Sequence, residues 1–295
     1  MADIDELSAA LAVACSTGKD MDAWNVEDFP LPSLGKKIHS WMSELNLGRG
    51  FQLVRGFPVR EYSKEDCELV YWGIGLHMGE AVPQNTDGDL LGHVRDVGAD
   101  PNAYGVRLYK TRVEQDFHTD GADIIGLFCL RGGRSGGVSR IVSSVTIYNE
   151  LVKQRPDLAT VLRETFPFDT QGQQKPGQQP WFDFPICHED QGRLRTFFIP
   201  WYIRESQVHE GAPQLSADQI ACVEMIEKIA NREDFYLDMH FEPGDMQFLK
   251  NAAILHKRTE YEDWDEPEEK RHLLRLWLTS HQFSLGDEML RKGIS

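Results

Sequence analysis

The chain contains no run of apolar residues long enough to cross a bilayer, which takes about 20 residues in a helix. The pattern of a secretory leader is missing too, because the first residues, MADIDELSAA, are acidic where a leader is basic and then apolar. These two absences argue against a membrane protein and against a secreted one. We therefore expect a soluble, cytoplasmic protein.

Paired cysteines and basic clusters are missing as well. The five cysteines form no C-x-x-C pair, which argues against a disulfide framework and against a zinc knuckle. The formal net charge is -16, and no dense block of lysine and arginine offsets it. Such a surface would repel a phosphate backbone, so nucleic acid is an unexpected partner.

The composition is otherwise that of a globular protein. With 295 residues, 41% of them hydrophobic and 26% charged, the chain can bury one large core with insertions. We expect one domain over residues 1–295, with a helical outer cover in residues 1–80 and a β core in residues 84–280. A small-molecule partner and a homo-oligomer are both compatible with this composition.

Helix caps occur in the first third of the chain. Ser33 precedes a segment with apolar residues at helical spacing, and Gly48 follows it. Ser63, with Asp66 three residues later, resembles a capping box for a second helix. The strand-like sequence FQLVRGF lies between the two segments.

From about residue 104 the sequence changes to short runs typical of β-strands, several of them separated by Gly or Pro turns. These runs are YGVRLYKT, DIIGLFCL, SRIVSSV, LRTFFIP, FYLDMHF, DMQFLKNAAIL and HLLRLWLTS. Helical segments at 146–162, broken around Pro156, and at 216–230 interrupt the runs without alternating regularly with them. The pattern therefore predicts a mainly β sandwich or barrel with flanking helices.

Two connections in the β region are informative. Residues 242–245, Glu-Pro-Gly-Asp, predict a type II turn, so the runs on either side of it are a candidate hairpin. Residues 169–192 are rich in Gln, Gly and Pro and have no clean period. This segment is either an inserted lid that presents aromatic side chains to a site or an ordinary long surface loop.

His118-Thr119-Asp120 is the strongest functional signal. On a strand, residues two apart point the same way, so His118 and Asp120 can reach one ion. His256 ends an apolar run on a later strand and can supply the third ligand. Two histidines and one carboxylate with open positions are the ligand set of non-haem iron(II) oxygenases.

Competing residues have to be weighed against this set. A second H-x-D sequence, His188-Glu189-Asp190, has no apolar strand directly after it, and we interpret it as a chance match in a solvated turn. Asp116 and Asp123 flank the first motif, and Asp116 shares the predicted face of His118. By itself, His118 could also be an ordinary hydrogen-bonded histidine at a strand end.

Two arginines strengthen the interpretation. Arg275 lies within the apolar run RHLLRLWLT, where a guanidinium is costly to bury unless an anion pairs with it. Arg271 lies four residues earlier, on the same face if the strand includes it. Guanidinium groups suit bidentate recognition of carboxylates. The alternative for each arginine is an internal salt bridge.

Several ordered motifs together resemble the taurine dioxygenase and clavaminate synthase-like (TauD/TfdA) family of iron(II)/2-oxoglutarate oxygenases. They are H-T-D at 118–120, S-G-G-V-S at 135–139, P-G-D at 243–245, N-A-A-I-L-H-K-R-T at 251–259 and R-H-L-L-R-L-W-L at 271–278. The resemblance covers about residues 84–280.

The resemblance implies a fold, a ligand set and cofactors. The fold would be a distorted double-stranded β-helix, or cupin-like jelly roll, with the metal between its sheets. His118, Asp120 and His256 match the family's facial triad for Fe(II). Arg271 matches the arginine that pairs with the distal carboxylate of 2-oxoglutarate, and Ser139 falls where many members place a threonine for the same group. Arg275 matches a position that holds either the substrate's anionic group or the co-substrate.

The activity implied is a dioxygenase reaction with O2 and 2-oxoglutarate that releases succinate and CO2. Hydroxylation of an unactivated C-H bond is the expected outcome, with desaturation or ring closure as alternatives. Arg275 suggests a carboxylate-bearing or amino-acid-like substrate. Gln84 and Asn85 are candidates for the pocket wall, although plain turn chemistry also explains them. We expect Arg258 to support the site from behind the ligands.

Two other functions use the same residues. A cupin-like hydrolase or isomerase would bind zinc or manganese with the three ligands and would need no keto acid, which leaves Arg271 and Ser139 without a role. A non-enzymatic jelly-roll binding module would not explain why two histidines and an acid converge.

Overall fold

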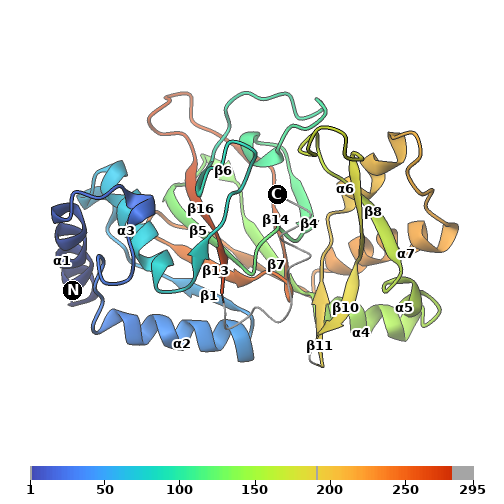
Figure 1. The fold of residues 1–295 in the computed structure, drawn as a ribbon, viewed down its shortest axis with the longest axis horizontal. Helices are drawn as coiled ribbons and strands as arrows, with labels where there is room; N and C mark the ends of the chain where they lie inside the picture. The colour runs from blue at the N-terminus through green and yellow to red at the C-terminus, as the bar shows by residue number, and fades with distance from the viewer. Residues whose placement is uncertain (1, 191, 281–295) are drawn as a thin grey trace.

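Two antiparallel β-sheets form the centre of the protein, of which the computed structural model describes residues 2–190 and 192–280 (Figure 1). The larger sheet has the order β1-β13-β5-β16-β2, with β3 also paired to β16. Its strands are β1 (Phe51–Val54), β2 (Glu80–Ala81), β3 (Leu91–Val94), β5 (Ile124–Arg131), β13 (Met246–Lys250) and β16 (His272–Thr279). The smaller sheet has the order β12-β7-β14-β4. Its strands are β4 (Gln115–His118), β7 (Ser139–Ser143), β12 (Tyr236–Met239) and β14 (Ile254–Arg258).

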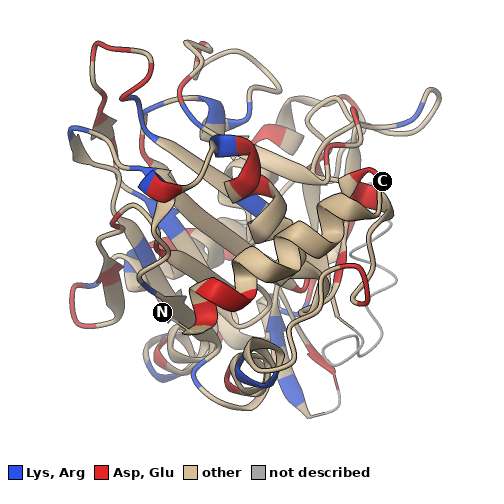
Figure 2. Cartoon of the chain, turned by 90° about the vertical axis from the view of Figure 1, so that its left-hand side faces the viewer, with Lys and Arg blue, Asp and Glu red and all other residues tan. Residues whose placement is uncertain are grey.

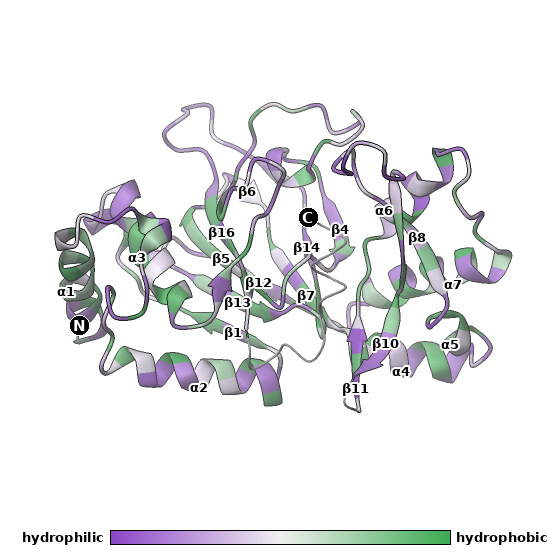
Figure 3. Ribbon diagram, in the orientation of Figure 1, coloured by the Kyte–Doolittle hydropathy of each residue, from purple (hydrophilic) through white to green (hydrophobic). Residues whose placement is uncertain are grey.

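Three N-terminal helices cover the outer face of the larger sheet. They are α1 (Ala2–Ser16), α2 (Leu34–Leu47) and α3 (Lys64–Leu76). Ile38 of α2 and Val70 of α3 lie in one core cluster with Phe128, Phe248 and Leu274 of the sheet. In Figure 3, strands β5, β13 and β16 are coloured mainly as hydrophobic. β1, which lies between α2 and α3 in the sequence, joins the sheet by pairing with β13. The domain boundaries given above remain a prediction.

A second group of helices covers the outer face of the smaller sheet, at the opposite end of the molecule (Figure 1). It comprises α4 (Ser144–Gln154), α5 (Leu158–Val161) and α7 (Ala217–Ala230). Beside them lie α6 (Pro200–Glu205) and two hairpins, β8 (Thr165–Asp169) with β9 (Trp181–Pro185) and β10 (Cys187–Asp190) with β11 (Arg193–Thr196). The short strands β6 (Ser135–Gly136) and β15 (Tyr261–Glu262) pair with each other and form a separate two-stranded sheet.

The alternation of side chains along each strand explains why residues with chemical functions gather between the sheets. In β16, Leu274, Leu276 and Leu278 pack toward the N-terminal helices, so the alternate residues face the other sheet. In β14, Ile254 belongs to the cluster between the sheets and Leu255 to the outer one. β16 is buried along its whole length because both of its faces are covered.

This arrangement confirms the predicted mainly β fold with flanking helices and two facing sheets. The helix predictions hold too, with α4 ending before Pro156 and α5 beginning after it. Ser216 forms the capping box with Gln219, and the Ser63 side chain accepts a hydrogen bond from Asp66 N. Helix α2 begins after Ser33, but the Ser33 side chain makes no cap.

The predicted hairpin around residues 242–245 is wrong. The turn itself is present, with Gly244 at φ +100° and Asp245 N donating to Glu242 O at 3.0 Å. However, β12 before the turn pairs with β7, and β13 after it pairs with β5 and β1. The turn therefore passes the chain from one sheet to the other. Local turn chemistry does not distinguish a hairpin from such a crossing.

The solvated turn predicted at His188-Glu189-Asp190 is wrong as well. The three residues belong to β10, which pairs with β11 over Cys187–Asp190. That this second motif binds no metal stays a prediction. Within the described ranges, the only group of three or more potential metal ligands is elsewhere in the fold.

Charge is distributed without a concentrated basic face on the side that carries the N-terminal helices (Figure 2). Lys and Arg residues there are interspersed along the ribbon with Asp and Glu residues. None of the helices in the described part of the chain has the length and apolar character needed to span a membrane.

Gly244 provides a test of the crossing between the sheets. A Cβ at this position would overlap Phe57 O, whereas a Cβ at Gly88, which has a similar positive φ of +83°, would meet nothing within 4 Å. We expect Gly88→Ala to cost about 1 to 2 kcal/mol from backbone strain alone. Gly244→Ala should cost at least about 2 kcal/mol more, because the backbone must also move. Urea unfolding of both variants measures the difference, and equal midpoints would contradict the proposed clash.

Candidate metal centre

Three side chains from two elements of the smaller sheet meet in the space between the sheets. His118 ends β4, Asp120 follows it, and His256 lies in β14, directly opposite His118 in the β-ladder. One ligand atom from each residue lies within 4.8 Å of the others, and all three residues are buried. The His118 and His256 ring centroids are 4.2 Å apart. The structure therefore brings together the three residues that the sequence singled out.

Hydrogen bonds orient His118 for coordination. Its Nδ1 lies 2.7 Å from Asp116 O, so this nitrogen carries the proton, and the Nε2 lone pair points into the site, where it accepts a hydrogen bond from Gln115 Nε2. The Nε2 atom is 3.9 Å from Asp120 Oδ1 and 3.1 Å from Gln115 Nε2. Trp201 packs edge-on to the ring, with centroids 5.0 Å apart.

Asp120, and neither Asp116 nor Asp123, is the carboxylate that faces the histidines. The Asp116 side chain is exposed and lies 3.4 Å from Lys257 Nζ, on the outer face of the sheet. Asp123 accepts a hydrogen bond from Ser280 N at 3.0 Å, so its carboxylate is engaged with the chain that follows β16.

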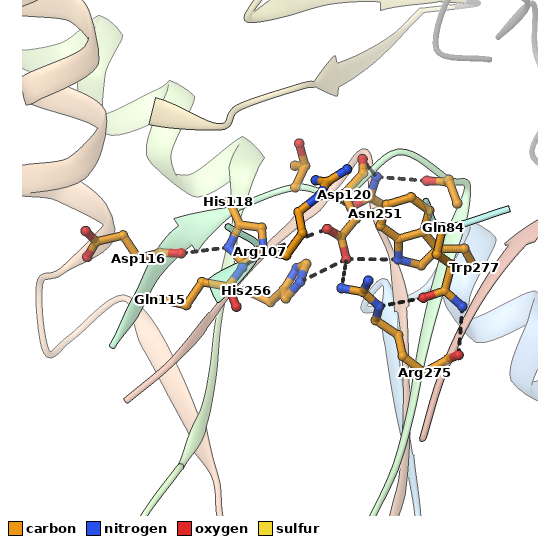
Figure 4. A network of polar contacts seen from close by, with 12 residues as sticks. Gln84, Arg107, Gln115, Asp116, His118, Asp120, Asn251, His256, Arg275 and Trp277 are labelled. Carbon is orange, nitrogen blue, oxygen red and sulfur yellow. Dashed lines mark hydrogen bonds and ion pairs between the residues drawn. The ribbon is translucent and has the colours of Figure 1, made fainter. Parts of the chain in front are cut away.

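Backbone and side-chain contacts hold Asp120 in place. Asn251 Oδ1 accepts from Asp120 N at 2.8 Å, and Asn251 Nδ2 donates to Asp120 O at 2.6 Å and to Ala122 O at 2.8 Å. Trp277 Nε1 donates to Asp120 Oδ2 at 3.1 Å. Asp120 Oδ2 also lies 3.5 Å from Arg275 Nη1 and 3.6 Å from His256 Nε2 (Figure 4).

Electrostatics give His118 and Asp120 the protonation states that a metal ion requires. Burial, together with the nearby His256, lowers the pKa of His118 to about 3. Burial alone would raise the pKa of Asp120, but Arg275 and the two histidines hold it well below its ordinary value. Near neutral pH the site therefore presents a neutral imidazole at His118 beside an ionised carboxylate, as metal binding needs.

A cavity opens directly beside His118 and Asp120. The empty space within it, part of which is open to solvent, is about 690 Å³. The charged residues in its wall are Arg107, Arg275, Asp120 and Asp169. Its aromatic wall comprises Tyr109, Phe182, Phe197, Trp201, Tyr202 and Trp277.

Part of the predicted lid segment contributes to this cavity. Thr170, Gln171, Gln173 and Phe182 line it, whereas Phe184 packs in the outer core. Residues 181–190 form strands over most of their length, so only the first part of the segment is a loop. Whether the segment closes over a substrate stays a prediction.

Arg275 points at the candidate metal centre, and Gln84 supports it from behind. Gln84 is 2% exposed; its Oε1 accepts from Arg275 Nε at 2.8 Å, and its Nε2 donates to Arg275 O at 2.9 Å. Asn85 closes a turn by accepting hydrogen bonds from Asp87 N and Asp89 N. Among the described residues that line the cavity, neither Gln84 nor Asn85 is found. The sequence predicted both residues as part of the pocket wall. Instead, Gln84 supports Arg275, and Asn85 closes a turn.

Arg271 occupies a separate, deeper position. It is 4% exposed, and its Nη1 has no hydrogen-bond partner. Burial lowers the pKa of Arg271, while neighbouring Tyr261 opposes the shift. Within residues 2–190 and 192–280, no carboxylate lies at ion-pair distance from its guanidinium. Gly137 lets this group approach, since a Cβ there would be 3.0 Å from Arg271 Nε.

Ser139 and Arg258 lie close to the same region. They are opposite each other in the pairing of β7 with β14. Ser139 Oγ donates to Gln247 Oε1 at 3.1 Å. Arg258 contacts the Tyr261 ring, as Arg271 does, and two of its guanidine nitrogens have no partner. An incompletely paired, buried guanidinium is unfavourable, so this region fits an additional anionic group.

The fold and the site together define the class of protein. Two histidines and one carboxylate between the sheets of a jelly roll, with a cavity beside them, are the arrangement of a non-haem iron oxygenase. Residues 16–277 match the family described as "Taurine catabolism dioxygenase TauD, TfdA family". The chain belongs to the TauD/TfdA family, and it is a non-haem iron(II)/2-oxoglutarate-dependent dioxygenase. This result confirms the resemblance and overturns the zinc hydrolase or isomerase alternative.

Two curated relatives are similar over most of this chain. The "FR-33289 synthase" of Streptomyces rubellomurinus (strain ATCC 31215) is 31% identical over 253 residues, which are 84% of this chain and 74% of the relative. The "Taurine hydroxylase-like protein SAT17" of Stachybotrys chartarum (strain CBS 109288 / IBT 7711) is 32% identical over 289 residues, or 93% and 72% of the two chains.

Solved structures show the same fold at low sequence identity. Asparagine oxygenase in complex with Fe(II), 2S,3S-3-hydroxyasparagine and succinate has a TM-score of 0.72 at 13% identity, covering 94% of this chain and 91% of that one. The non-haem iron oxygenase OrfP in complex with Fe and alpha-ketoglutaric acid has a TM-score of 0.65 at 15% identity, covering 94% and 92%. These similarities confirm the predicted jelly-roll fold.

Several residues at the site were not predicted from the sequence. Trp277 and Asn251 lie within the family motifs, but nothing local shows that their side chains reach Asp120. Gln115, Trp201 and Arg107 come from segments whose sequences carry no metal-site pattern. Only the pairing of strands and the packing of loops brings these residues to the centre.

Asn251 allows a test of how Asp120 is positioned. Asn251→Ala removes three hydrogen bonds around the Asp120 backbone, so we expect roughly a tenfold to hundredfold loss of metal affinity. Stability should also fall by about 1 to 3 kcal/mol, because buried backbone groups lose partners. Titration with Co(II), followed by absorption, measures the affinity. Asn149→Ala, on the exposed face of α4, is the control, and equal affinity for all three proteins would refute the role of Asn251.

Proposed function

We propose that His118, Asp120 and His256 hold Fe(II), and that the enzyme hydroxylates an unactivated C-H bond of a small, carboxylate-bearing or amino-acid-like metabolite, with release of succinate and CO2. The observation that carries the proposal is the convergence of these three buried ligands beside a cavity that Arg275 and aromatic side chains line. The two histidine nitrogens and one carboxylate oxygen would leave coordination positions for 2-oxoglutarate and O2.

The region around Arg271 supports a place for the co-substrate. Arg271 would pair with the distal carboxylate of 2-oxoglutarate, and Ser139 would donate a hydrogen bond to the same group. The unpartnered Nη1 of Arg271 fits this role, because a bidentate carboxylate supplies the missing acceptor. Ser139 would then exchange its hydrogen bond to Gln247 for one to the carboxylate.

When bound, iron(II), 2-oxoglutarate and O2 together supply the oxidant, and the protein's residues control where it acts. Asn251 and Trp277 keep Asp120 in a fixed orientation, so that the open positions face the cavity. The aromatic wall excludes water from the reacting carbon. Arg275, fixed by Gln84, would hold the substrate's carboxylate so that one C-H bond lies at the metal.

The structural neighbours support the substrate class. One is named as an asparagine oxygenase bound to a hydroxyasparagine, and OrfP is seen in complex with Fe and alpha-ketoglutaric acid. Another OrfP complex contains succinate and (3S)-hydroxy-L-Arg. Small amino-acid-like metabolites are therefore the first compounds to screen for stimulated succinate release.

The first test uses the wild-type protein. Fe(II) and 2-oxoglutarate added without oxygen should produce a weak visible charge-transfer band, and admission of air should then yield succinate. His256→Ala removes one ligand and should abolish both signals. If the wild-type protein is fully loaded with iron and shows neither signal, the proposed function is wrong.

Arg271 provides the second test. Arg271→Ala should raise the 2-oxoglutarate concentration needed for half-maximal band intensity by about a hundredfold, since a buried charge-assisted pair contributes about 2 to 5 kcal/mol. Co(II) affinity should stay nearly unchanged. Arg271→Lys keeps the positive charge but loses the bidentate guanidinium. Its half-maximal 2-oxoglutarate concentration should therefore lie between those of the wild-type protein and Arg271→Ala. Parallel losses of metal and 2-oxoglutarate binding would instead mean that the arginine is structural.

A further inference from the structure

Arg107 is a second guanidinium in the cavity wall, and the function proposed above does not use it. It immediately precedes the short helix η3 (Leu108–Lys110) and lines the same cavity as Arg275. The Tyr109 ring centroid lies 4.6 Å from Arg275 Cζ, so η3, which contains Tyr109, packs directly against Arg275. In Figure 4, Arg107 and Arg275 approach the Asp120 carboxylate from different sides.

The protein pairs Arg107 with a neutral group. Arg107 Nη1 donates a short hydrogen bond to the Tyr202 hydroxyl. Burial raises the pKa of Tyr202 to about 12, so this hydroxyl carries no charge near neutral pH. Among the described residues, no carboxylate lies within ion-pair distance of Arg107. Its positive charge therefore borders the cavity without an anionic partner.

The carboxylates in the cavity wall do not compensate the two arginines. Asp169 is fully buried and already accepts hydrogen bonds from Tyr104, Gln171 and His209. Asp120 is the carboxylate of the candidate metal site, where a divalent cation would take up its charge. Once metal is bound, two guanidinium charges face the cavity, and only Asp169, which is engaged with its own partners, offsets them.

We propose that Arg107 and Arg275 together bind a substrate that carries two negative charges at one end. This inference rests on the proposed function and concerns the anionic end of its substrate, which would carry two charges in place of a single carboxylate. The charges belong either to one tetrahedral group, such as a phosphonate or phosphate ester, or to two neighbouring carboxylates. Arg275 takes one anionic oxygen beside the metal, and Arg107, oriented by Tyr202, takes another from a different side of the cavity.

Two guanidinium groups favour such an anion for a physical reason. Each can form a charge-assisted, bidentate pair, and a single carboxylate cannot neutralise both. A monoanionic ligand would leave one guanidinium charge uncompensated in a partly desolvated cavity. The preference for a doubly charged group should therefore depend on Arg107 specifically.

Calorimetric titration with three simple anions tests the inference. The probes are propylphosphonate, at a pH at which it is doubly charged, butyrate, which has the same propyl chain but one charge less, and propylmalonate, which carries two carboxylates on one carbon beside that chain. The protein is first loaded anaerobically with Fe(II) and 2-oxoglutarate. We expect propylphosphonate or propylmalonate to bind at least about tenfold more tightly than butyrate.

Variants assign that preference to a residue. Arg107→Ala should remove most of the difference between the doubly charged probe and butyrate while changing butyrate binding less than about threefold. Arg107→Lys should retain part of it. Arg112→Ala is the matched control, because Arg112 is exposed in the same segment and should leave all affinities unchanged. Tighter binding of propylphosphonate or of propylmalonate identifies whether the cavity takes a tetrahedral dianion or two neighbouring carboxylates.

Equal affinity for butyrate and both doubly charged probes would overturn the inference. A uniform loss of all three probes in Arg107→Ala would overturn it as well, since Arg107 would then only shape the cavity. The same titrations on protein loaded with Zn(II) require neither iron nor the keto acid, and Asp120 is again beside a divalent cation. If the charge-transfer band never forms but the Arg107-dependent preference is present, the proposed function fails and the anion site remains.

Discussion

The position of Asp120 is the constraint on which the rest of the site depends. Its backbone is tied to Asn251, its carboxylate accepts from Trp277, and Arg275 lies beside it. These three partners lie in or next to strands of the larger sheet, whereas Asp120 follows a strand of the smaller one. The carboxylate can therefore face the two histidines only when the sheets are packed together. Any change that separates the sheets should loosen the ligands as well.

Strand alternation distributes the chemistry. Leucines on one side of β16 pack against the N-terminal helices, and this burial turns Arg275 and Trp277 toward the smaller sheet. The same alternation in β14 places His256 inward and Leu255 outward. A shift of one residue in either pairing would exchange the two sets, so hydrophobic packing on the outer faces also determines which polar residues reach the interior.

Positive charge in the interior has two distinct positions. Arg271 lies deep beside Tyr261 with an unpartnered nitrogen, whereas Arg275 and Arg107 border the cavity at the candidate metal centre. Under the proposed function, this separation would suit two different anions, the co-substrate and the substrate, which must bind at the same time. Two separate positions would let one protein bind both anions without exchanging them.

The sequence alone was sufficient for the class of fold and for the convergence of His118, Asp120 and His256, because several ordered motifs besides H-T-D together resemble one family, whereas H-x-D by itself also occurs at 188–190. It failed where residues on either side of a turn join different sheets, as at 242–245, because turn chemistry is local and strand pairing is not. Only the tertiary structure showed that Gln84 supports Arg275, that Asn251 holds Asp120 and that Arg107 borders the cavity. These contacts join residues that are far apart in the chain, and their geometry depends on how sheets, helices and loops pack as a whole.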